Sequence, residues 1–100
     1  PTIGYQENIP NAFELHQNFP NPFNPSTIIS FKLLKEGFVT LKVYNELGQE
    51  IATLLNNQYL DEGENQITFD ANKLSSGVYF YRLNVNNGEF ISTKKLVLMK

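Results

Sequence analysis

The amino-acid sequence predicts an all-β protein, an antiparallel immunoglobulin-like β-sandwich of about seven strands. Three observations support this fold class. Apolar and polar residues alternate along several short segments. Turn-forming residues separate these segments at intervals of roughly 8–12 residues. Three prolines within six residues, Pro20, Pro22 and Pro25, exclude a helix or a central strand near the start of the chain.

The chain of 100 residues is long enough for one domain with one hydrophobic core. Residues 1–12 are polar and follow no period, so we expect a linker or the tail of a preceding region there, with the domain at residues 13–100. The first residues lack the basic and apolar parts of a signal peptide. We therefore expect the chain to be part of a longer protein that carries any export signal upstream.

The first expected element is a short edge strand at residues 13–15, followed by a rigid, extended loop at residues 18–25. We expect Phe19 and Phe23 of this loop to pack onto the core. Further strands are expected at residues 27–33, 39–44, 50–55, 65–70, 78–85 and 90–99. The alternation places these residues on the core face: Ile29, Phe31, Leu33, Val39, Leu41, Val43, Ile67, Phe69, Tyr79, Tyr81, Leu83 and Val85.

The connections follow from the turn residues. Residues 45–49 predict a five-residue hairpin loop in which Gly48 supplies a positive φ. The triplet Asn86-Asn87-Gly88 predicts a tight hairpin of the Asn-Gly type. A single helical turn is expected near residues 72–74, and a short helix at residues 50–57 is an alternative to the strand.

Composition excludes several classes of function. The chain has no cysteine, eight basic against ten acidic residues, and one histidine, His16. These counts exclude disulfides, thiolate metal sites and histidine-based triads. The near-neutral balance gives no basic footprint for nucleic acid, and no apolar run approaches the ~20 residues that span a bilayer. We expect no enzyme activity, no cofactor and no metal.

Two further candidate sites have ordinary explanations. Four carboxylates near two turns offer the hard oxygens that calcium prefers, but their spacing matches no calcium loop and predicts solvated turns. Three aromatic residues are candidates for a sugar-binding platform, although most aromatics of a small sandwich pack in its core or rim. The carboxylates are Asp61, Glu62, Glu64 and Asp70, and the aromatics are Tyr44, Tyr59 and Phe80.

Four segments, in order, resemble the type A C-terminal sorting domains of the type IX (Por) secretion system of Bacteroidetes. The opening, at residues 13–27, contains Pro20, Asn21, Pro22, Phe23, Asn24 and Pro25. A hairpin at residues 43–50 contains Gly48, and a strand at residues 74–83 contains Gly77 and Tyr79. The ending consists of Lys94, Lys95, Leu96, Val97, Leu98, Met99 and Lys100. One departure is Gln49, where the family more often has Arg or Lys.

The resemblance implies an export address rather than a catalyst. An outer-membrane translocon would recognise the folded domain in the periplasm and carry an upstream passenger protein to the cell surface or the medium. A sortase-like peptidase would remove the domain and attach the passenger to surface lipopolysaccharide. The alternatives are a structural immunoglobulin-like spacer and a carbohydrate-binding accessory domain.

The residues also indicate where such an address is read. Residues 96–99 are apolar on both faces of the last strand, and an uncovered apolar edge is a liability. We therefore expect residues 94–100 to dock on the export receptor, by strand addition in one version. The equally weighted alternative is that residues 13–23 cover this surface.

Overall fold

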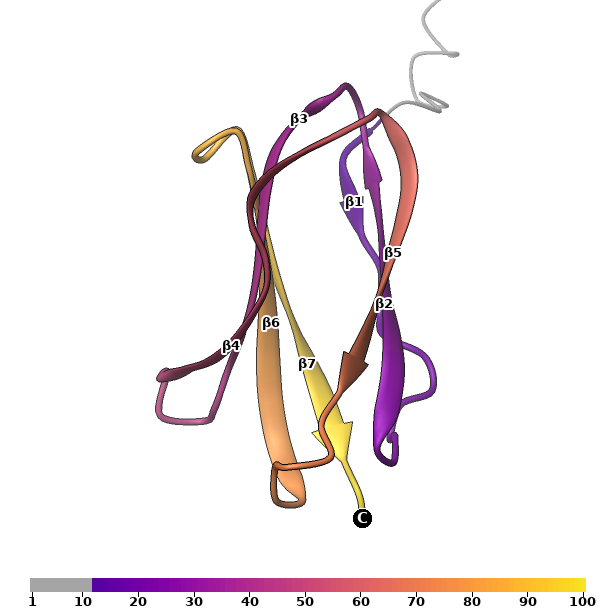
Figure 1. Ribbon diagram of the computed structural model, residues 1–100, viewed down its shortest axis with the longest axis vertical. Helices are drawn as coiled ribbons and strands as arrows, with labels where there is room; N and C mark the ends of the chain where they lie inside the picture. Colours follow the sequence, from indigo (N-terminus) through magenta and orange to yellow (C-terminus); the bar gives the residue numbers. More distant parts are fainter. Residues whose placement is uncertain (1–11) are drawn as a thin grey trace, which may run out of the picture.

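The computed structural model describes residues 12–100, which form two antiparallel sheets packed face to face (Figure 1). The linker predicted at residues 1–12 lies outside the described residues, apart from Ala12. The described residues contain seven strands and no helix. The strands are β1 (Glu14–Leu15), β2 (Ser26–Leu33), β3 (Gly37–Tyr44), β4 (Glu50–Leu60), β5 (Gly63–Asp70), β6 (Gly77–Val85) and β7 (Phe90–Leu98).

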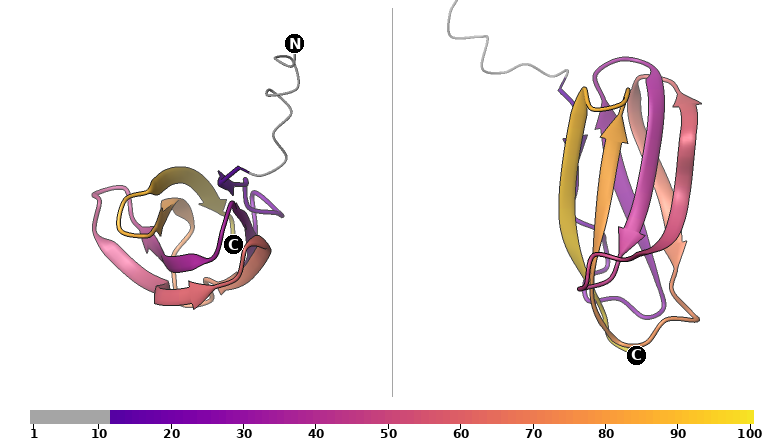
Figure 2. Two further views of the ribbon diagram at one scale, coloured as in Figure 1. Left: turned by 90° about the horizontal axis from the view of Figure 1, so that it is seen from above. Right: turned by 90° about the vertical axis from the view of Figure 1, so that its left-hand side faces the viewer.

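The strand order confirms the predicted immunoglobulin-like sandwich. One sheet has the order β1-β2-β5 and the other β4-β3-β6-β7. The second and fifth strands therefore pair in one sheet, and the third and sixth in the other, as in immunoglobulin-type Greek keys. Figure 2 shows the two layers from above and the four-stranded sheet from its outer side. The sheets end in β1 and β7 on one flank, and in β5 and β4 on the other.

The core forms where the alternation predicted it. The inward residues of β3, Val39, Leu41 and Val43, are fully buried, whereas Thr40 and Lys42 face outward. Tyr81 is the largest fully buried side chain and lies at the centre of β6. Ile67 is partly buried and packs against the core. Every core position expected on a strand therefore points inward.

Tyr79 fixes the connection between the two sheets. Its hydroxyl donates a 2.6 Å hydrogen bond to the backbone carbonyl of Ser75, just before β6 begins. A tyrosine near the start of the sixth strand that bonds back to its own connection is the tyrosine corner of immunoglobulin-like domains. The motif around Gly77 and Tyr79 is thus explained by folding.

The structure corrects three local expectations and confirms a fourth. Phe23 is buried in the core, but Phe19 is 78% exposed because its backbone pairs with Ile28 on the outside of the sandwich. The helix alternative for residues 50–57 is wrong, because β3 pairs with the whole segment as β4. The Asn-Gly hairpin is a four-residue loop, in which Asn86 and Asn87 both have positive φ. The expected helical turn is a single turn, closed by a hydrogen bond from the amide of Leu74 to the carbonyl of Ala71.

Candidate functional site

The proline segment, residues 17–25, lies along the free edge of β7. The amide of Phe23 donates to the carbonyl of Val97, and the amide of Met99 donates to the carbonyl of Phe23, each at 3.0 Å. The side chain of Asn21 accepts a hydrogen bond from the amide of Val97 at 3.0 Å. Gln17 Nε2 donates to the carbonyl of Lys95 at 2.7 Å. The segment therefore acts as an added strand on the last third of β7.

A buried amide holds the proline segment in shape. Asn18 is 2% exposed, and its Nδ2 donates to Thr27 Oγ1 at 3.0 Å and to the carbonyl of Pro20 at 3.2 Å. Thr27 Oγ1, itself buried, also donates to the Pro20 carbonyl at 2.9 Å. The opening motif of the chain is therefore a closed polar network next to β2. The peptide bonds before Pro20, Pro22 and Pro25 are cis.

The predicted recognition residues divide between core and surface. Leu96 and Leu98 are 0% and 1% exposed and belong to the core. On the other side of the strand, Lys95 is exposed and Val97 is half-buried. Met99, just beyond β7, is 59% exposed. Only part of the predicted surface is therefore accessible to a partner of the folded domain.

The two flanking lysines also have different surroundings. Lys94 is half-buried, on the same side of β7 as Leu96. Lys100 is exposed, and its Nζ donates to the carbonyl of Asn72 at 2.6 Å while its amide donates to Ser76 Oγ at 2.9 Å. The end of the chain is therefore tied to the connection between β5 and β6.

The structure distinguishes two ways in which a partner could bind the edge of β7, by strand addition or by contact with side chains. Strand addition at residues 95–99 would require the proline segment to leave, because Gln17, Asn21 and Phe23 already use the outward backbone groups there. Docking on side chains needs no such displacement. The buried network of Asn18 and Thr27 was not found from the sequence, although polar residues flanking a proline run were a signal for it.

The hairpin motif is a self-contained turn. Gly48 has a φ of 84°, which glycine adopts without strain. Asn45 Oδ1 accepts hydrogen bonds from the amides of Leu47 and Gln49, each at 2.9 Å. The side chain of Gln49 in turn accepts a hydrogen bond from Asn45 Nδ2 at 2.7 Å. Gln49 therefore caps the turn in this chain.

Titratable groups with shifted pKa values have structural roles. Burial raises the pKa of Tyr81 to about 12, and its hydroxyl donates to the carbonyl of His16 at 2.6 Å. A hydrogen bond from Thr53, and then one from Lys42, lowers the pKa of Glu50. Hydrogen bonds from Asn86 and Lys35 lower the pKa of Glu89. None of these groups lies in an enclosed polar cavity, which general acid–base catalysis would use.

The other candidate sites are not assembled. Among residues 12–100, no three metal-ligating side chains come together, and this includes Asp61, Glu62, Glu64 and Asp70. Tyr44 pairs with Phe80 across β3 and β6, whereas Tyr59 packs edge-on against Phe38 at the other end of the sheet. The three aromatics therefore do not form one platform. No helix among the described residues is long and apolar enough to cross a membrane.

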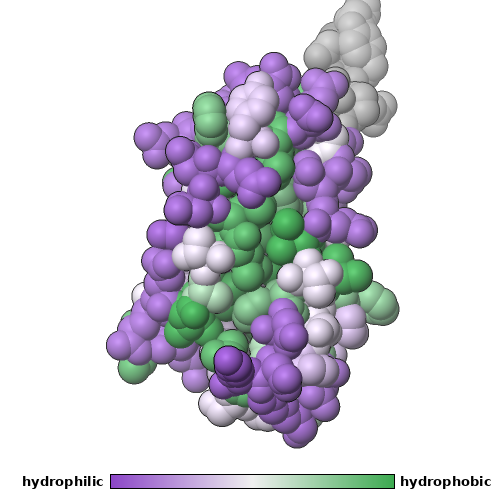
Figure 3. Space-filling view, viewed as in Figure 1, coloured by the Kyte–Doolittle hydropathy of each residue, from purple (hydrophilic) through white to green (hydrophobic). Residues whose placement is uncertain are grey.

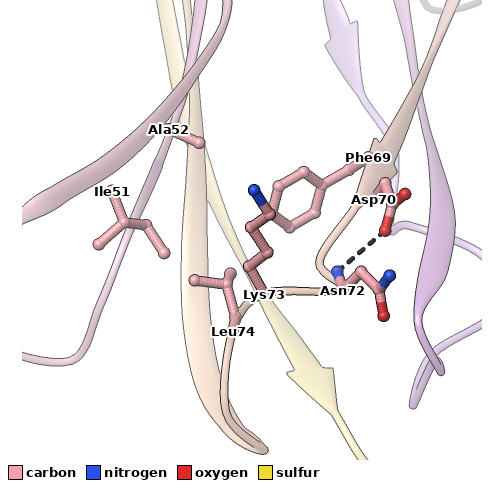
Figure 4. A pocket seen from close by; sticks show the side chains of 7 residues that line it. All are labelled: Ile51, Ala52, Phe69, Asp70, Asn72, Lys73 and Leu74. Carbon is pink, nitrogen blue, oxygen red and sulfur yellow. Dashed lines mark hydrogen bonds between the residues drawn. The ribbon is translucent and has the colours of Figure 1, made fainter.

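An apolar stripe lies between the two sheets on the face shown in Figure 3. Part of it is an open recess of about 340 Å³, drawn in Figure 4. Ile51 and Ala52 of β4 face Phe69 of β5 across it, and the amide of Asn72 donates to Asp70 Oδ1 at 2.9 Å on its rim. Asp70, Asn72 and Lys73 add polar groups to this otherwise apolar recess.

Comparisons with known proteins agree with the fold and with the order of the motifs. A family model described as the secretion system C-terminal sorting domain matches residues 17–99. No curated protein matches the chain. Solved structures with similar folds include PorZ from Porphyromonas gingivalis, described as an essential bacterial surface component of the type-IX secretion system, and CopC from Methylosinus trichosporium OB3b.

These structural likenesses are distant in sequence. PorZ is 14% identical to this chain, with a TM-score of 0.58. The match covers 86% of this chain but only 11% of the PorZ chain. CopC is also 14% identical, with a TM-score of 0.57 over 87% of this chain and 93% of its own. The first immunoglobulin domain of mouse SynCAM 2 is 17% identical over 75% of this chain and 81% of its own, with a TM-score of 0.40. At such identities the likeness concerns the fold alone.

Proposed function

Because the chain belongs to the secretion system C-terminal sorting domain family, whose members are the sorting signals of type IX secretion, we propose that the export machinery reads this domain in its folded state, at the end of β7. The sorting function itself follows from family membership. The proposal adds the position of the surface that the export machinery recognises, which we call the reading surface. It is formed by the accessible side chains of Lys95, Val97, Met99 and Lys100.

One observation carries this proposal. The proline segment and the end of β7, which are about 75 residues apart in sequence, form one hydrogen-bonded unit through Asn21, Phe23 and Val97. An unfolded chain would not hold these two motifs together. A receptor that recognises both therefore distinguishes the folded domain from an unfolded passenger.

The domain would act without catalysis and without a cofactor. Its family is one of sorting signals, and its described residues hold no assembled metal or nucleophile site. Its passenger would lie upstream of residue 12 and leave the cell, or stay on its surface. In the proposed route, the protein passes through the periplasm and an outer-membrane translocon acts as its receptor. A sortase-like peptidase then removes residues 13–100.

The test uses a reporter protein fused upstream of residues 1–100 in a host with type IX secretion. Deleting residues 96–100 is a poor test, because it removes Leu96 and Leu98 from the core. Surface substitutions are better: Lys95→Glu with Lys100→Glu should reduce export of a domain that still folds. The control Lys35→Glu makes one such lysine-to-glutamate change, in the loop between β2 and β3. Equal export of the double variant and the control would overturn the proposed reading surface.

A further inference from the structure

The outer faces of the two sheets differ in chemistry. On β5, which ends the three-stranded sheet, the outward side chains are Glu64, Gln66, Thr68 and Asp70, and all four are exposed. A polar face of this kind is expected where an antiparallel sheet meets water. The outer side of β5 therefore needs no partner.

The outer face of β6 and β7 does not follow that rule. Three cross-strand pairs lie side by side there: Val78 with Val97, Phe80 with Lys95, and Arg82 with Thr93. We call these six residues the outer strip; its strands are seen from the outside in the right panel of Figure 2. Val78, Phe80 and Val97 are only half-buried, so apolar surface remains open between two cations. Ile91, on the same side of β7, is 55% exposed.

Basic residues outnumber acidic residues around the outer strip. The strands β3, β6 and β7 contain four basic residues and no acidic residue: Lys42, Arg82, Lys94 and Lys95. Glu50 pairs with Lys42 at 3.1 Å, and Glu46 lies on the neighbouring hairpin loop. Among the described residues, Arg82 and Lys95 form no ion pair. Two unpaired cations are thus left beside apolar side chains.

Arg82 is held in place for an incoming group. Its guanidinium carbon lies 5.3 Å from the centre of the Tyr44 ring, a cation–π distance, and its Nε donates to Thr93 Oγ1 at 3.4 Å. It lines an open recess of about 360 Å³ together with Phe80, Gly48 and the acidic Glu46 of the hairpin loop. An arginine fixed in this way loses little freedom on binding a carboxylate, which its remaining N–H groups match in geometry.

We infer that the docking surface extends from the end of β7 onto β6 through the outer strip, which shares Lys95 and Val97 with the reading surface, and that the strip receives an acidic surface of a protein of the export machinery. This inference rests on the proposed function for the identity of the partner. Charge complementarity sets the sign of that partner, and the half-buried apolar side chains supply the buried area. In a two-fold pair of copies this patch would meet the same patch, which also carries Arg82 and Lys95, so cations would face a cationic surface, and this disfavours a second copy as the occupant.

The first experiment separates the strip from the end of β7. In the reporter fusion to residues 1–100, Arg82→Glu is compared with Arg82→Lys and with Lys35→Glu. We expect Arg82→Glu to lower translocon-dependent export about tenfold or more, because it would place like charges face to face, and Arg82→Lys to lower it less, because lysine keeps the charge but not the planar guanidinium. The thermal midpoint of the purified variants reports that they remain folded. Export of Arg82→Glu at the level of Lys35→Glu would overturn the inference.

The second experiment does not depend on the host. The ¹⁵N-labelled chain is titrated with a copolymer of glutamate and tyrosine, and separately with phosphatidylglycerol vesicles. We expect salt-sensitive shifts of the amides of Phe80, Arg82 and Lys95 with the copolymer, and none on β5. Binding to the vesicles at equal strength would replace the protein partner by a lipid and overturn the inference, as would shifts spread over both faces. If the unaltered fusion shows no translocon-dependent export, the proposed function fails, and this titration still decides whether the strip binds acidic groups.

Discussion

Phe23 and Val97 are joined by a hydrogen bond of 3.0 Å from the amide of Phe23 to the carbonyl of Val97. This bond links the start of the domain to its last strand. Phe23 also places its ring in the core, 6.2 Å from the ring of Phe69. The proline-rich opening therefore closes the fold on the flank where β7 would otherwise be an open edge, which is how many natural sheets protect an edge.

The network of Asn18 predicts how firmly the proline segment is held. Asn18→Ala leaves the buried Thr27 hydroxyl and the Pro20 carbonyl without their amide partner, a loss of about 1–3 kcal/mol. The segment should open more often, so hydrogen exchange at the amides of Val97 and Met99 should accelerate about tenfold or more. Asn24→Ala, at an exposed position of the same segment, is the control. Unchanged exchange in Asn18→Ala would show that other contacts hold the segment.

The tyrosine corner predicts a loss of stability without a change of shape. Tyr79→Phe removes the hydroxyl that donates to the Ser75 carbonyl, and should lower the free energy of unfolding by about 1–2 kcal/mol. Urea denaturation measures this difference. Tyr59→Phe, at a 54% exposed position, should change it by less than about 0.5 kcal/mol. Equal effects of the two substitutions would contradict the role given to Tyr79.

Tyr81 predicts a loss of stability in alkali. Its pKa is raised from 10.0 to about 12 by burial, so the unfolded chain releases this proton at a lower pH than the folded domain does. The contribution of Tyr81 is complete below pH 10 and is lost as the pH rises from 10 to 12. Tyr81→Phe should show a shallower fall of stability over this range. Urea denaturation at each pH measures the free energy of unfolding of both proteins. If this free energy fell in parallel for the two proteins, the result would contradict the raised pKa.

The hairpin loop predicts a residue-specific cost at one glycine. Gly48 has a φ of 84°, where an added methyl group strains the backbone although nothing lies within 4 Å of it. Gly48→Ala should therefore destabilise the domain by about 1 kcal/mol. Gly48→Asn should cost less, since asparagine tolerates this region and does so at Asn57, Asn86 and Asn87. Equal stability of Gly48→Ala and the unaltered protein would mean that the loop changes shape.

At the end of β7, the buried and the exposed residues should have different roles, the former in folding and the latter in recognition. Leu96→Ala creates a cavity in the core and should lower the free energy of unfolding by about 2–5 kcal/mol. Met99→Ala, on the surface, should change it by less than about 0.5 kcal/mol. Differential scanning calorimetry compares the two. If Met99→Ala proved as destabilising as Leu96→Ala, residue 99 would be part of the core and not of a reading surface.

The strands and the core could be predicted from the sequence because alternation with a period of two has one physical meaning in a sandwich. In β3 and β6 every second residue is large and apolar, and only one face of each sheet can be buried. Turn residues such as Gly48 then fixed the positions of the loops. The immunoglobulin-like class follows from the number and spacing of these strands.

Long-range contacts could not be predicted in the same way. Nothing in the composition of the proline segment distinguishes Phe23, which enters the core, from Phe19, which does not. That difference depends on two backbone pairings: Phe19 pairs with Ile28 nearby in the sequence, whereas Phe23 pairs with Leu98 at the far end of the domain. The outer strip is likewise visible only once β6 and β7 are in register.

The central claim is that the folded domain is the address for export. Secretion of a reporter fused upstream of residues 1–100 tests it most directly, when it is measured in a host with type IX secretion and in the same host without the translocon. The account predicts secretion in the first strain and retention in the second, with loss of secretion when Leu96→Ala is combined with Leu98→Ala to unfold the domain. Equal secretion in both strains, or undiminished secretion of the unfolded double variant, would contradict it.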